Sequence, residues 1–253
     1  MLMKKYAHIY KPLLERVYEE ERQKHKREKD GVKAAKAKLH TIFGAFSNTD
    51  AHKSALTLLE KNADEAEIMK FHASTRERLP YLTDFYGFIF AHIGASACVL
   101  DLGCGFNPFS LPWFPEKPKT YHALDIDTRT ADLTNRYFAL QNLPPLAACA
   151  DLAVETPNIQ ADVVFLFKLL PVLEAQKRGR GADLLRELRA KHFVLSYPLK
   201  TLSGKEKGFK DFYAAEARKL FSDEFPLVAE KVIGNELIYI LGVGRDVLIA
   251  PNI

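Results

Sequence analysis

The amino-acid sequence predicts an α/β fold in which a mostly parallel sheet follows an all-helical N-terminal region. Two features of the chain indicate this class. Residues 1–92 contain helical patterns and no strand pattern, whereas from Ala97 onward short apolar segments alternate with helical ones, as in parallel sheets with right-handed crossovers. The last two apolar segments flank Gly234-Asn235, a dipeptide typical of an antiparallel hairpin. We therefore expect two domains, residues 1–92 and residues 93–253.

The N-terminal region is predicted to be a series of short helices. Residues 10–29 are charged and poor in strand-forming residues, and residues 32–43 place their apolar side chains on one helical stripe. Residues 47–50, Ser-Asn-Thr-Asp, are a loop and helix-start signal. The helices expected after this loop span 51–61, 64–72 and 75–92.

The loop 101–105, Asp-Leu-Gly-Cys-Gly, indicates a nucleoside-binding site. It follows an apolar strand, and Asn107 and Pro108 are typical of a helix N-cap and a first helical residue. Glycine lets the backbone approach a ligand closely because it has no Cβ. Asp125 ends the next predicted strand, 20 positions after Gly105, where a carboxylate can bind ribose hydroxyls.

The same loop favours S-adenosylmethionine (SAM) over a dinucleotide. A dinucleotide fingerprint has a third glycine that lets a helix meet a pyrophosphate, and here that position is Pro108. SAM has no phosphate; it has a ribose, an adenine and a cationic methionine end, which suit the acids at Asp101 and Asp125. A purely structural turn, or a site for another nucleotide, is the alternative.

Seven strands are expected in the second domain, and an antiparallel hairpin closes the series. This is the layout of a class I SAM-dependent methyltransferase, a Rossmann-like fold whose ligands lie beyond the carboxyl ends of the strands. Asp101, Asp125, Asp151 and Lys168 all lie at that edge. The expected strands are 97–102, 120–125, 146–150, 162–167, 192–197, 226–233 and 236–243.

The composition is that of an ordinary globular protein, with 47% hydrophobic and 27% charged residues among 253. No apolar run reaches the length of a membrane span, and the N-terminus lacks a signal-peptide core. The three cysteines form no disulfide framework, and the eight histidines show no metal-ligand spacing. We expect a cytoplasmic monomer with no membrane contact and no structural metal.

Positive charge is concentrated at the N-terminus. Residues 1–40 hold 12 Lys and Arg against 6 acids, although the net charge of the whole chain is only +4. A basic arm on a near-neutral enzyme domain favours a polyanionic partner; a solvated helical face of mixed charge is the alternative. The basic residues that we expect to contact RNA here are Lys24, Lys26, Arg27, Lys33 and Lys36.

A second basic segment, residues 196–210, follows the fifth predicted strand. It contains Lys200, Lys205 and Lys207, two glycines and flanking aromatic residues. Such lysines can hold phosphates while an aromatic side chain stacks on a base. An exposed flexible loop is the alternative.

The residues after the third and fourth strands indicate the chemistry. Asp151 stands where a class I domain often contacts adenine, or it caps the next helix. Lys168 ends an apolar strand opposite the transferred methyl group, unless its stem only extends past the sheet edge. The chain lacks the Asn/Asp-Pro-Pro-aromatic sequence of amino-nitrogen methyltransferases, and no cysteine is placed for pyrimidine C5 chemistry. An acceptor with a free lone pair, such as guanine N7, needs only orientation and a suitable electrostatic environment.

A family resemblance extends along nearly the whole chain. It rests on residues 38–40 with 44–46, 72–79, 99–108, 167–174, 196–198 with 204–208, and 233–239. Together these blocks resemble the aminoglycoside-resistance 16S rRNA methyltransferases of the Arm/Rmt and Sgm/FmrO type. The resemblance implies methylation of N7 of guanine 1405 at the decoding site of the assembled 30S subunit, which blocks aminoglycosides of the kanamycin/gentamicin class. The helical domain would then dock on folded rRNA.

The resemblance also implies roles for matching residues. Arg78 would bind the SAM carboxylate, Asp125 the ribose and Asp151 the adenine. Lys168 would face the guanine, near Lys200 and the 203–208 loop, and we expect Lys168 and Asp151 to be the catalytic residues. Where the family has Leu-Gln-Asp, this chain has Cys-Ala-Asp at 149–151, so the glutamine contact is not carried over. The other cofactor-binding residues implied are His72, Ser74, Asp101, Gly103, Cys104, Gly105, Ile126, Leu152 and Phe167.

Two other functions stay open at the level of sequence. One is a SAM-dependent methyltransferase that acts on another rRNA or tRNA base or on a small molecule. The other is a non-catalytic RNA-binding assembly factor with a decayed methyltransferase domain. The basic arm argues against a small-molecule acceptor, and the intact glycine loop with Asp101, Asp125 and Arg78 argues against decay.

Overall fold

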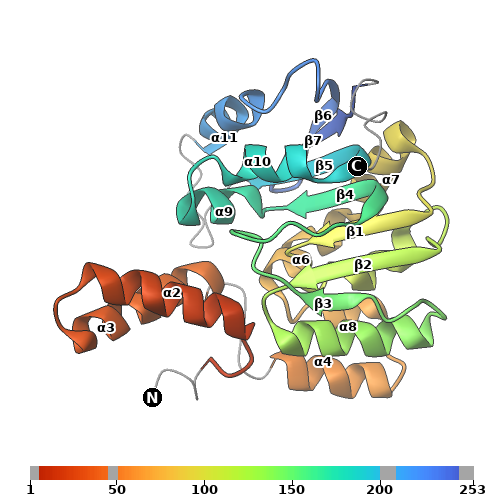
Figure 1. Cartoon of the computed structure of the whole chain (residues 1–253). Helices are drawn as coiled ribbons and strands as arrows, with labels where there is room; N and C mark the ends of the chain where they lie inside the picture. Colours follow the sequence, from red (N-terminus) through yellow and green to blue (C-terminus); the bar gives the residue numbers. More distant parts are fainter. Residues whose placement is uncertain (1–5, 45–50, 200–208, 245–253) are drawn as a thin grey trace.

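The protein is built on a seven-stranded sheet with the order β3-β2-β1-β4-β5-β7-β6 (Figure 1). The computed structural model describes residues 6–44, 51–199 and 209–244. Strands β1 to β5 are parallel, whereas β7 is antiparallel to β5 and to β6. The strands are β1 Cys98–Leu102, β2 Thr120–Asp125, β3 Ala147–Cys149, β4 Gln160–Phe167, β5 Arg189–Pro198, β6 Leu227–Ile233 and β7 Glu236–Gly242.

All seven expected strands are present, and the antiparallel hairpin between β6 and β7 is confirmed. The largest differences lie at the amino ends of β4 and β5, which begin at Gln160 and Arg189 instead of 162 and 192. Gln160 and Arg189 are paired neighbours in the sheet, and both are exposed. Polar residues at an exposed strand end carry no apolar signal, so the sequence pattern missed them.

The helices differ from expectation mainly where one long helix was predicted over 75–92. That prediction is wrong, because α6 ends at Arg78 and a 3-10 turn separates it from α7. Pro80 lies in this turn and has no backbone N–H for a continuous helix. The helical segments are α2 Lys11–Lys24, α3 Glu28–Leu39, η1 His40–Gly44, α4 Ala51–Glu60, α5 Glu65–Met69, α6 Ala73–Arg78, η2 Leu79–Tyr81, α7 Leu82–Ile93, η3 Asn107–Trp113, α8 Thr128–Leu140, α9 Leu170–Gln176, α10 Arg180–Glu187 and α11 Phe209–Arg218.

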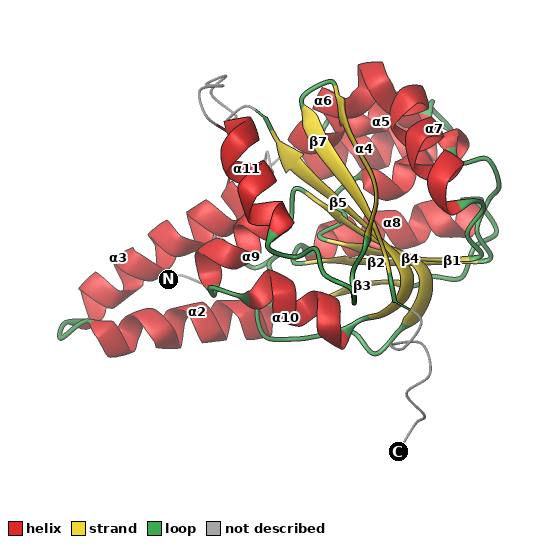
Figure 2. Ribbon diagram, turned by 90° about the horizontal axis from the view of Figure 1, so that it is seen from above, coloured by secondary structure: helices red, strands yellow, loops and turns green. Residues whose placement is uncertain are grey.

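Helices cover both faces of the sheet (Figure 2). On β4, Val163 and Phe165 join the hydrophobic cluster that includes residues of α4, α5, α7 and α8, whereas Val164 and Leu166 join the cluster that includes residues of α9, α10 and α11. A strand buried on both faces requires this alternation, because successive side chains point to opposite sides. The sheet is therefore the central layer of the molecule, buried between the two sets of helices.

The first helices form a separate N-terminal lobe, residues 6–44, with a hydrophobic cluster of its own. Figure 1 shows α2 and α3 of this lobe standing apart from the sheet. The helices from Ala51 onward instead share their core with the strands, and we call residues 51–244 the sheet unit. The hydrophobic clusters thus separate near residues 45–50, whereas the domain division at 92/93 stays a prediction. The lobe cluster consists of Tyr6, Ile9, Leu13, Leu14, Val17, Ala35, Leu39 and Ile42.

No helix in the described part of the chain is both long enough and apolar enough to cross a membrane. Within the same residues, no group of three or more His, Cys, Asp and Glu side chains is arranged to hold a metal ion.

Candidate active site

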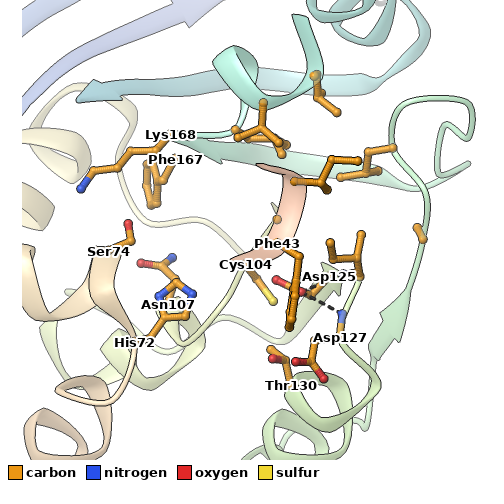
Figure 3. A pocket seen from close by; sticks show the side chains of 18 of the residues that line it. Phe43, His72, Ser74, Cys104, Asn107, Asp125, Asp127, Thr130, Phe167 and Lys168 are labelled. Carbon is orange, nitrogen blue, oxygen red and sulfur yellow. Dashed lines mark hydrogen bonds between the residues drawn. The ribbon is translucent and has the colours of Figure 1, made fainter. Parts of the chain in front are cut away.

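A pocket opens at the carboxyl ends of β1, β2 and β4, where the sequence placed the ligand (Figure 3). Two expected cofactor residues, Asp101 and Gly105, do not line it; both are buried behind its wall. Side chains of the N-terminal lobe, such as Phe43, do line it. The expected residues that line the pocket are His72, Ser74, Arg78, Gly103, Cys104, Asp125, Ile126, Asp151, Leu152, Phe167 and Lys168.

The two glycines of the loop after β1 are required by packing as well as by backbone conformation. Gly103 and Gly105 have φ of +64° and +50°, values that favour glycine. A Cβ on Gly105 would lie 2.6 Å from Cε1 of His72, and a Cβ on Gly103 would lie 2.9 Å from Cδ1 of Leu169. From the sequence, both glycines were expected to let the backbone come close to a ligand. Gly105 instead lies behind the pocket wall and leaves room for the ring of His72.

Asp125 closes this loop onto the end of β2. Its Oδ2 accepts the N–H of Gly105 at 2.8 Å, and its Oδ1 accepts the N–H groups of Ile126 and Asp127 at 2.7 and 3.0 Å. Burial raises the pKa of Asp125, although these backbone donors counteract the shift. Each carboxylate oxygen has two lone pairs, so the group can hold the loop and still accept hydroxyl donors from the pocket.

Asn107 does not cap a helix as the sequence indicated. The N-cap position belongs to Phe106, and the segment from Asn107 is a 3-10 helix. The amide of Asn107 instead donates to Oδ2 of Asp101 at 2.9 Å and accepts from Nη1 of Arg78 at 2.8 Å. Burial raises the pKa of Asp101 to about 6. Asp101 therefore does not line the pocket itself. It orients the amide of Asn107, which does line the pocket.

Arg78 is buried in an ion pair that sequence reasoning missed. Its Nε and Nη2 donate to the two carboxylate oxygens of Glu236 at 3.0 and 2.9 Å, and its guanidinium lies 4.3 and 4.6 Å from the ring centroids of Phe85 and Phe167. Burial lowers the pKa of Arg78, but Glu236 outweighs this and raises it above its usual value. Three of its five N–H groups have partners among the described residues, so two can serve a ligand carboxylate.

Lys168 is held at the same end of the pocket by two carboxylates. Its Nζ donates to Oε2 of Glu77 at 2.7 Å and lies 3.5 Å from Oε1 of Glu236. Its φ of +57° is uncommon for a residue with a side chain, and its N–H donates to the carbonyl of Ser196. The side chain is 8% exposed, so it does not extend past the sheet edge. Together with Arg78, it makes a cluster of two cations and two anions.

Asp151 is paired with an arginine from the N-terminal lobe. Oδ2 of Asp151 accepts from Nε of Arg16 at 2.6 Å, and Oδ1 accepts from Nη2 at 3.1 Å. The helix-cap alternative is not realised, because a turn and no helix follows Asp151. Arg16 is 135 positions away in the sequence, and its charged surroundings on α2 resemble a solvated helical face, so no local pattern identified it.

Two histidines pack around Phe106 beside the glycine loop: His52 is buried and His72 is half-buried. The ring of His72 stacks on Phe106, and that of His52 meets Phe106 edge to face. Nε2 of His52 is 2.8 Å from Oγ1 of Thr130. Burial lowers the pKa of His72 to about 3 and that of His52 to about 4. Both rings are therefore neutral near pH 7 and serve as packed walls rather than as cations.

The residues expected to contact RNA lie on the N-terminal lobe or outside the described residues. Lys24, Lys26, Arg27, Lys33 and Lys36 are all on its surface, and Lys24 pairs with Glu21 of its own helix. Lys200, Lys205 and Lys207 lie outside the described residues. The structure thus brings most of the residues expected to bind SAM together in one pocket and leaves the basic residues of α2 and α3 on a surface.

Sequence reasoning missed several residues that line the pocket or hold the side chains that line it. Glu236 had a usable signal: it is the one charged residue in the otherwise apolar strand β7, and lone acids in buried strands usually have a charged partner. Glu77 lies in the 72–79 block of the family resemblance without an assigned role. Phe43 and His52 had no such signal, because each looks like an ordinary packed aromatic in its helix.

The pocket suits SAM on the observations above. Asp125 has lone pairs for ribose hydroxyls, Arg78 has two N–H groups for a carboxylate, and the glycine loop leaves its backbone open to the ligand at Gly103. Asp125, Asp127 and Asp151 line the pocket; Asp127 and Asp151 are paired with arginines, whereas Asp125, among the described residues, is hydrogen-bonded to backbone N–H groups alone. A parallel sheet closed by an antiparallel hairpin, with this loop after β1 and an acid at the end of β2, defines a class I SAM-dependent methyltransferase.

The chain belongs to the ribosomal RNA methyltransferase (FmrO) family, whose model matches residues 3–240. It is 34% identical over 225 residues to a 16S rRNA (guanine(1405)-N(7))-methyltransferase of Micromonospora rosea, covering 84% of this chain and 82% of the relative. An enzyme of the same name from Serratia marcescens is 32% identical over 238 residues, covering 94% and 93%. The sequence-based assignment to this family and to an enzymatic rRNA methyltransferase is confirmed.

Solved structures agree with this assignment. The 16S rRNA methyltransferase RmtF, in complex with S-adenosyl-L-homocysteine, is 34% identical and superposes with a TM-score of 0.89, covering 96% of this chain and 95% of that chain. The 16S rRNA methylase RmtB is 30% identical with a TM-score of 0.83, covering 95% and 94%. The expected fold and the expected use of SAM as cofactor are both confirmed.

Proposed function

We propose that this protein methylates N7 of guanine 1405 of 16S rRNA within the 30S subunit, with SAM as the methyl donor, and thereby confers resistance to aminoglycosides of the kanamycin/gentamicin class. The observation that carries the proposal is one pocket that has Asp125 and Asp151 on its wall and the cluster of Arg78 and Lys168 at one end. The names of the relatives, similar over most of both chains, support guanine 1405 as the target. We further propose a cytoplasmic monomer.

The cofactor is assigned to the strand-end residues. Bound SAM supplies an electrophilic methyl carbon on a cationic sulfur, and loss of the methyl group leaves S-adenosyl-L-homocysteine. We assign the ribose hydroxyls to Asp125, the adenine amine to Asp151 and the methionine carboxylate to Arg78. Ile126, Leu152 and Phe167 line the pocket between these polar groups and exclude water from the bound nucleoside. Each assignment gives one polar part of SAM, the adenine, the ribose or the methionine carboxylate, a protein group of complementary charge or hydrogen-bonding capacity.

The acceptor side needs orientation rather than a base. The lone pair of N7 forms the new N–C bond while the C–S bond breaks, no proton is removed, and the guanine ring gains the positive charge. Lys168 is neutralised by Glu77 and Glu236, so it does not oppose that charge strongly. We assign it to hold the guanine through a hydrogen bond to an acceptor on the base edge, which orients N7 toward the methyl group.

The basic surface is assigned to rRNA docking. The major groove of A-form RNA is too narrow for an enzyme to reach N7, so the target base must be extruded or already exposed. Lys33 and Lys36 on α3, with Lys24, Lys26 and Arg27 nearby in the chain, are on the surface and can contact phosphates. Lys200, Lys205 and Lys207 follow β5 and are proposed to contact rRNA beside the guanine.

The test is to incubate the protein with tritiated SAM and purified bacterial 30S subunits, and then to map the label by borohydride–aniline cleavage. Cleavage at guanine 1405 is the expected result and establishes the atom and the nucleotide together. Label without cleavage would point to another atom and overturn the N7 assignment. Absence of label on 30S subunits, free rRNA and tRNA would favour a non-catalytic RNA-binding role.

A further inference from the structure

The N-terminal lobe and the sheet unit meet at the SAM pocket. Leu13 of α2 and Ile42 and Phe43 of η1 line the pocket from the side of the lobe, and Figure 3 draws Phe43 together with Asp125 among the lining side chains. Ile126 and Val172 of the sheet unit also line the pocket and pack against the hydrophobic cluster of the lobe. A ligand in this pocket therefore contacts both parts of the molecule.

Backbone hydrogen bonds between the two parts are also close to the pocket. The N–H of Tyr10 donates to the carbonyl of Ile126, and the N–H of Thr128 donates to the carbonyl of His8, both at 2.8 Å. These bonds attach the start of α2 to the turn after Asp125. Because the lobe has its own hydrophobic cluster, its position relative to the sheet unit depends on this small set of contacts.

Arg16 makes an ionic contact across this interface. Besides its two hydrogen bonds to Asp151, its Nη2 donates to Oε1 of Gln176 at 3.0 Å. The Arg16 side chain is 16% exposed and that of Asp151 is 2% exposed, so water screens the pair little. Arg16 also pairs with Glu20 at 2.8 Å, and Glu20 pairs with Lys38 of α3 at 2.6 Å. The charged contacts thus continue from the pocket to the second helix of the lobe.

We propose that Arg16 is a positioning residue that docks the N-terminal lobe onto the SAM pocket, so that one contact prepares both the cofactor site and the rRNA-binding surface. The part that concerns rRNA rests on the proposed function. A ligand that touches both parts binds best to the docked arrangement, and its apparent affinity falls in proportion to the docked fraction. Removal of the Arg16 guanidinium should therefore weaken SAM and rRNA binding together, and each ligand should partly restore the binding of the other.

The experiment compares Arg16→Gln with Arg22→Gln in the full chain. Arg22 lies on the same helix but is exposed and pairs with Glu19, so its variant is the matched control. The measurements are the Kd for S-adenosyl-L-homocysteine by calorimetry and hydrogen exchange of the α2 amides with and without that ligand. We expect Arg16→Gln to raise the Kd about tenfold if the docked fraction falls to about one tenth, and to speed α2 exchange until the ligand is added. Arg22→Gln should change neither.

A third measurement tests the link to rRNA. The affinity of each variant for 30S subunits is determined with and without S-adenosyl-L-homocysteine, and the ligand should strengthen 30S binding more in Arg16→Gln than in the wild type. Unchanged Kd and exchange in Arg16→Gln would overturn the proposal, and so would a weakened Kd with α2 exchange equal to wild type, because Arg16 would then act only through Asp151. The calorimetry and exchange require no methylation, so failure of the proposed function would show separately, as absence of label on 30S.

Discussion

The sheet unit holds a buried ion pair beside the pocket, whereas the N-terminal lobe holds exposed ion pairs on its surface. In the sheet unit, Arg78 and Glu236 are 2% and 4% exposed and hold each other through two hydrogen bonds. In the lobe, Arg22 and Glu19 are 52% and 46% exposed and pair across one helical turn. A buried pair is costly to break because the remaining charge loses its partner, whereas an exposed pair contributes little.

This difference separates two kinds of function. Substitutions of buried charges in the sheet unit should reduce stability and cofactor binding. Substitutions of exposed charges in the lobe should change RNA binding and leave the fold intact. Arg16 stands between the two classes, because it belongs to the lobe but its partner Asp151 is buried in the pocket.

The largest effect is expected at Arg78. Arg78→Met removes two hydrogen bonds from the buried Glu236 and leaves the more distant Lys168 as its cationic partner. We expect the free energy of unfolding to fall by about 3 kcal/mol and binding of S-adenosyl-L-homocysteine to be abolished. Denaturant unfolding and calorimetry measure the two effects. Adding Glu236→Leu should recover part of the stability without restoring binding. If Arg78→Met bound the ligand normally, the carboxylate assignment would be wrong.

The next effect is expected at Asp125 and is tested against Asp162 as a matched control. Removal of Asp125 should weaken cofactor binding, whereas removal of Asp162 should not. Asp125→Ala takes the acceptor from three backbone N–H groups beside the pocket, and a decrease of at least about tenfold in affinity for S-adenosyl-L-homocysteine is expected. Asp162 likewise accepts the N–H groups of Ala97 and Cys98, but at the amino end of the sheet. Asp162→Ala should cost stability and leave the affinity unchanged; equal effects on affinity would contradict the ribose assignment.

A smaller effect on the free energy of unfolding is expected when the pH is lowered. The pKa of His52 is lowered to about 4 by burial, while Asp127 counteracts and Arg129 and His8 add to the lowering. The unfolded state binds a proton near pH 6.5 and the folded state does not, so the stabilisation present above that pH is removed as the pH falls toward 4. Between pH 7 and pH 4.5, the free energy of unfolding of His52→Asn should therefore decrease by roughly 2–3 kcal/mol less than that of the wild type. Denaturant unfolding at both pH values tests this, and parallel decreases in the two proteins would refute it.

The smallest effect on stability is expected at the surface of the lobe. Lys33→Gln with Lys36→Gln should change the free energy of unfolding by no more than about 0.5 kcal/mol and leave cofactor affinity intact. Affinity for 30S subunits should fall, and its salt dependence should become shallower by about one unit of slope for each phosphate that is no longer neutralised. Lys117→Gln with Lys119→Gln, at the amino end of β2, is the control. An unchanged 30S affinity would identify the lobe surface as a solvated face.

The parts of the fold that were predicted correctly have local signals. The strands alternate with helical segments, Gly234-Asn235 marks the hairpin, and the glycine loop with Asp125 marks the pocket; each signal is a short run of residues. The incorrect predictions also have local causes. Pro80 interrupted a helix that apolar periodicity alone favoured, and the apparent N-cap Asn107 turned its side chain inward because Asp101 and Arg78 offer it buried partners.

Patterns along the chain and the family resemblance were enough to predict the class of protein and the position of the pocket at the strand ends, and 11 of the 13 predicted cofactor and catalytic residues line that pocket. They did not predict which charges hold one another, because those pairs form only when the chain is packed. Arg16 meets Asp151 across 135 positions, and Arg78 meets Glu236 across 158. Periodicity and turn propensity act over a few residues, whereas an ion pair between distant residues depends on how the whole chain folds, so no local pattern records it.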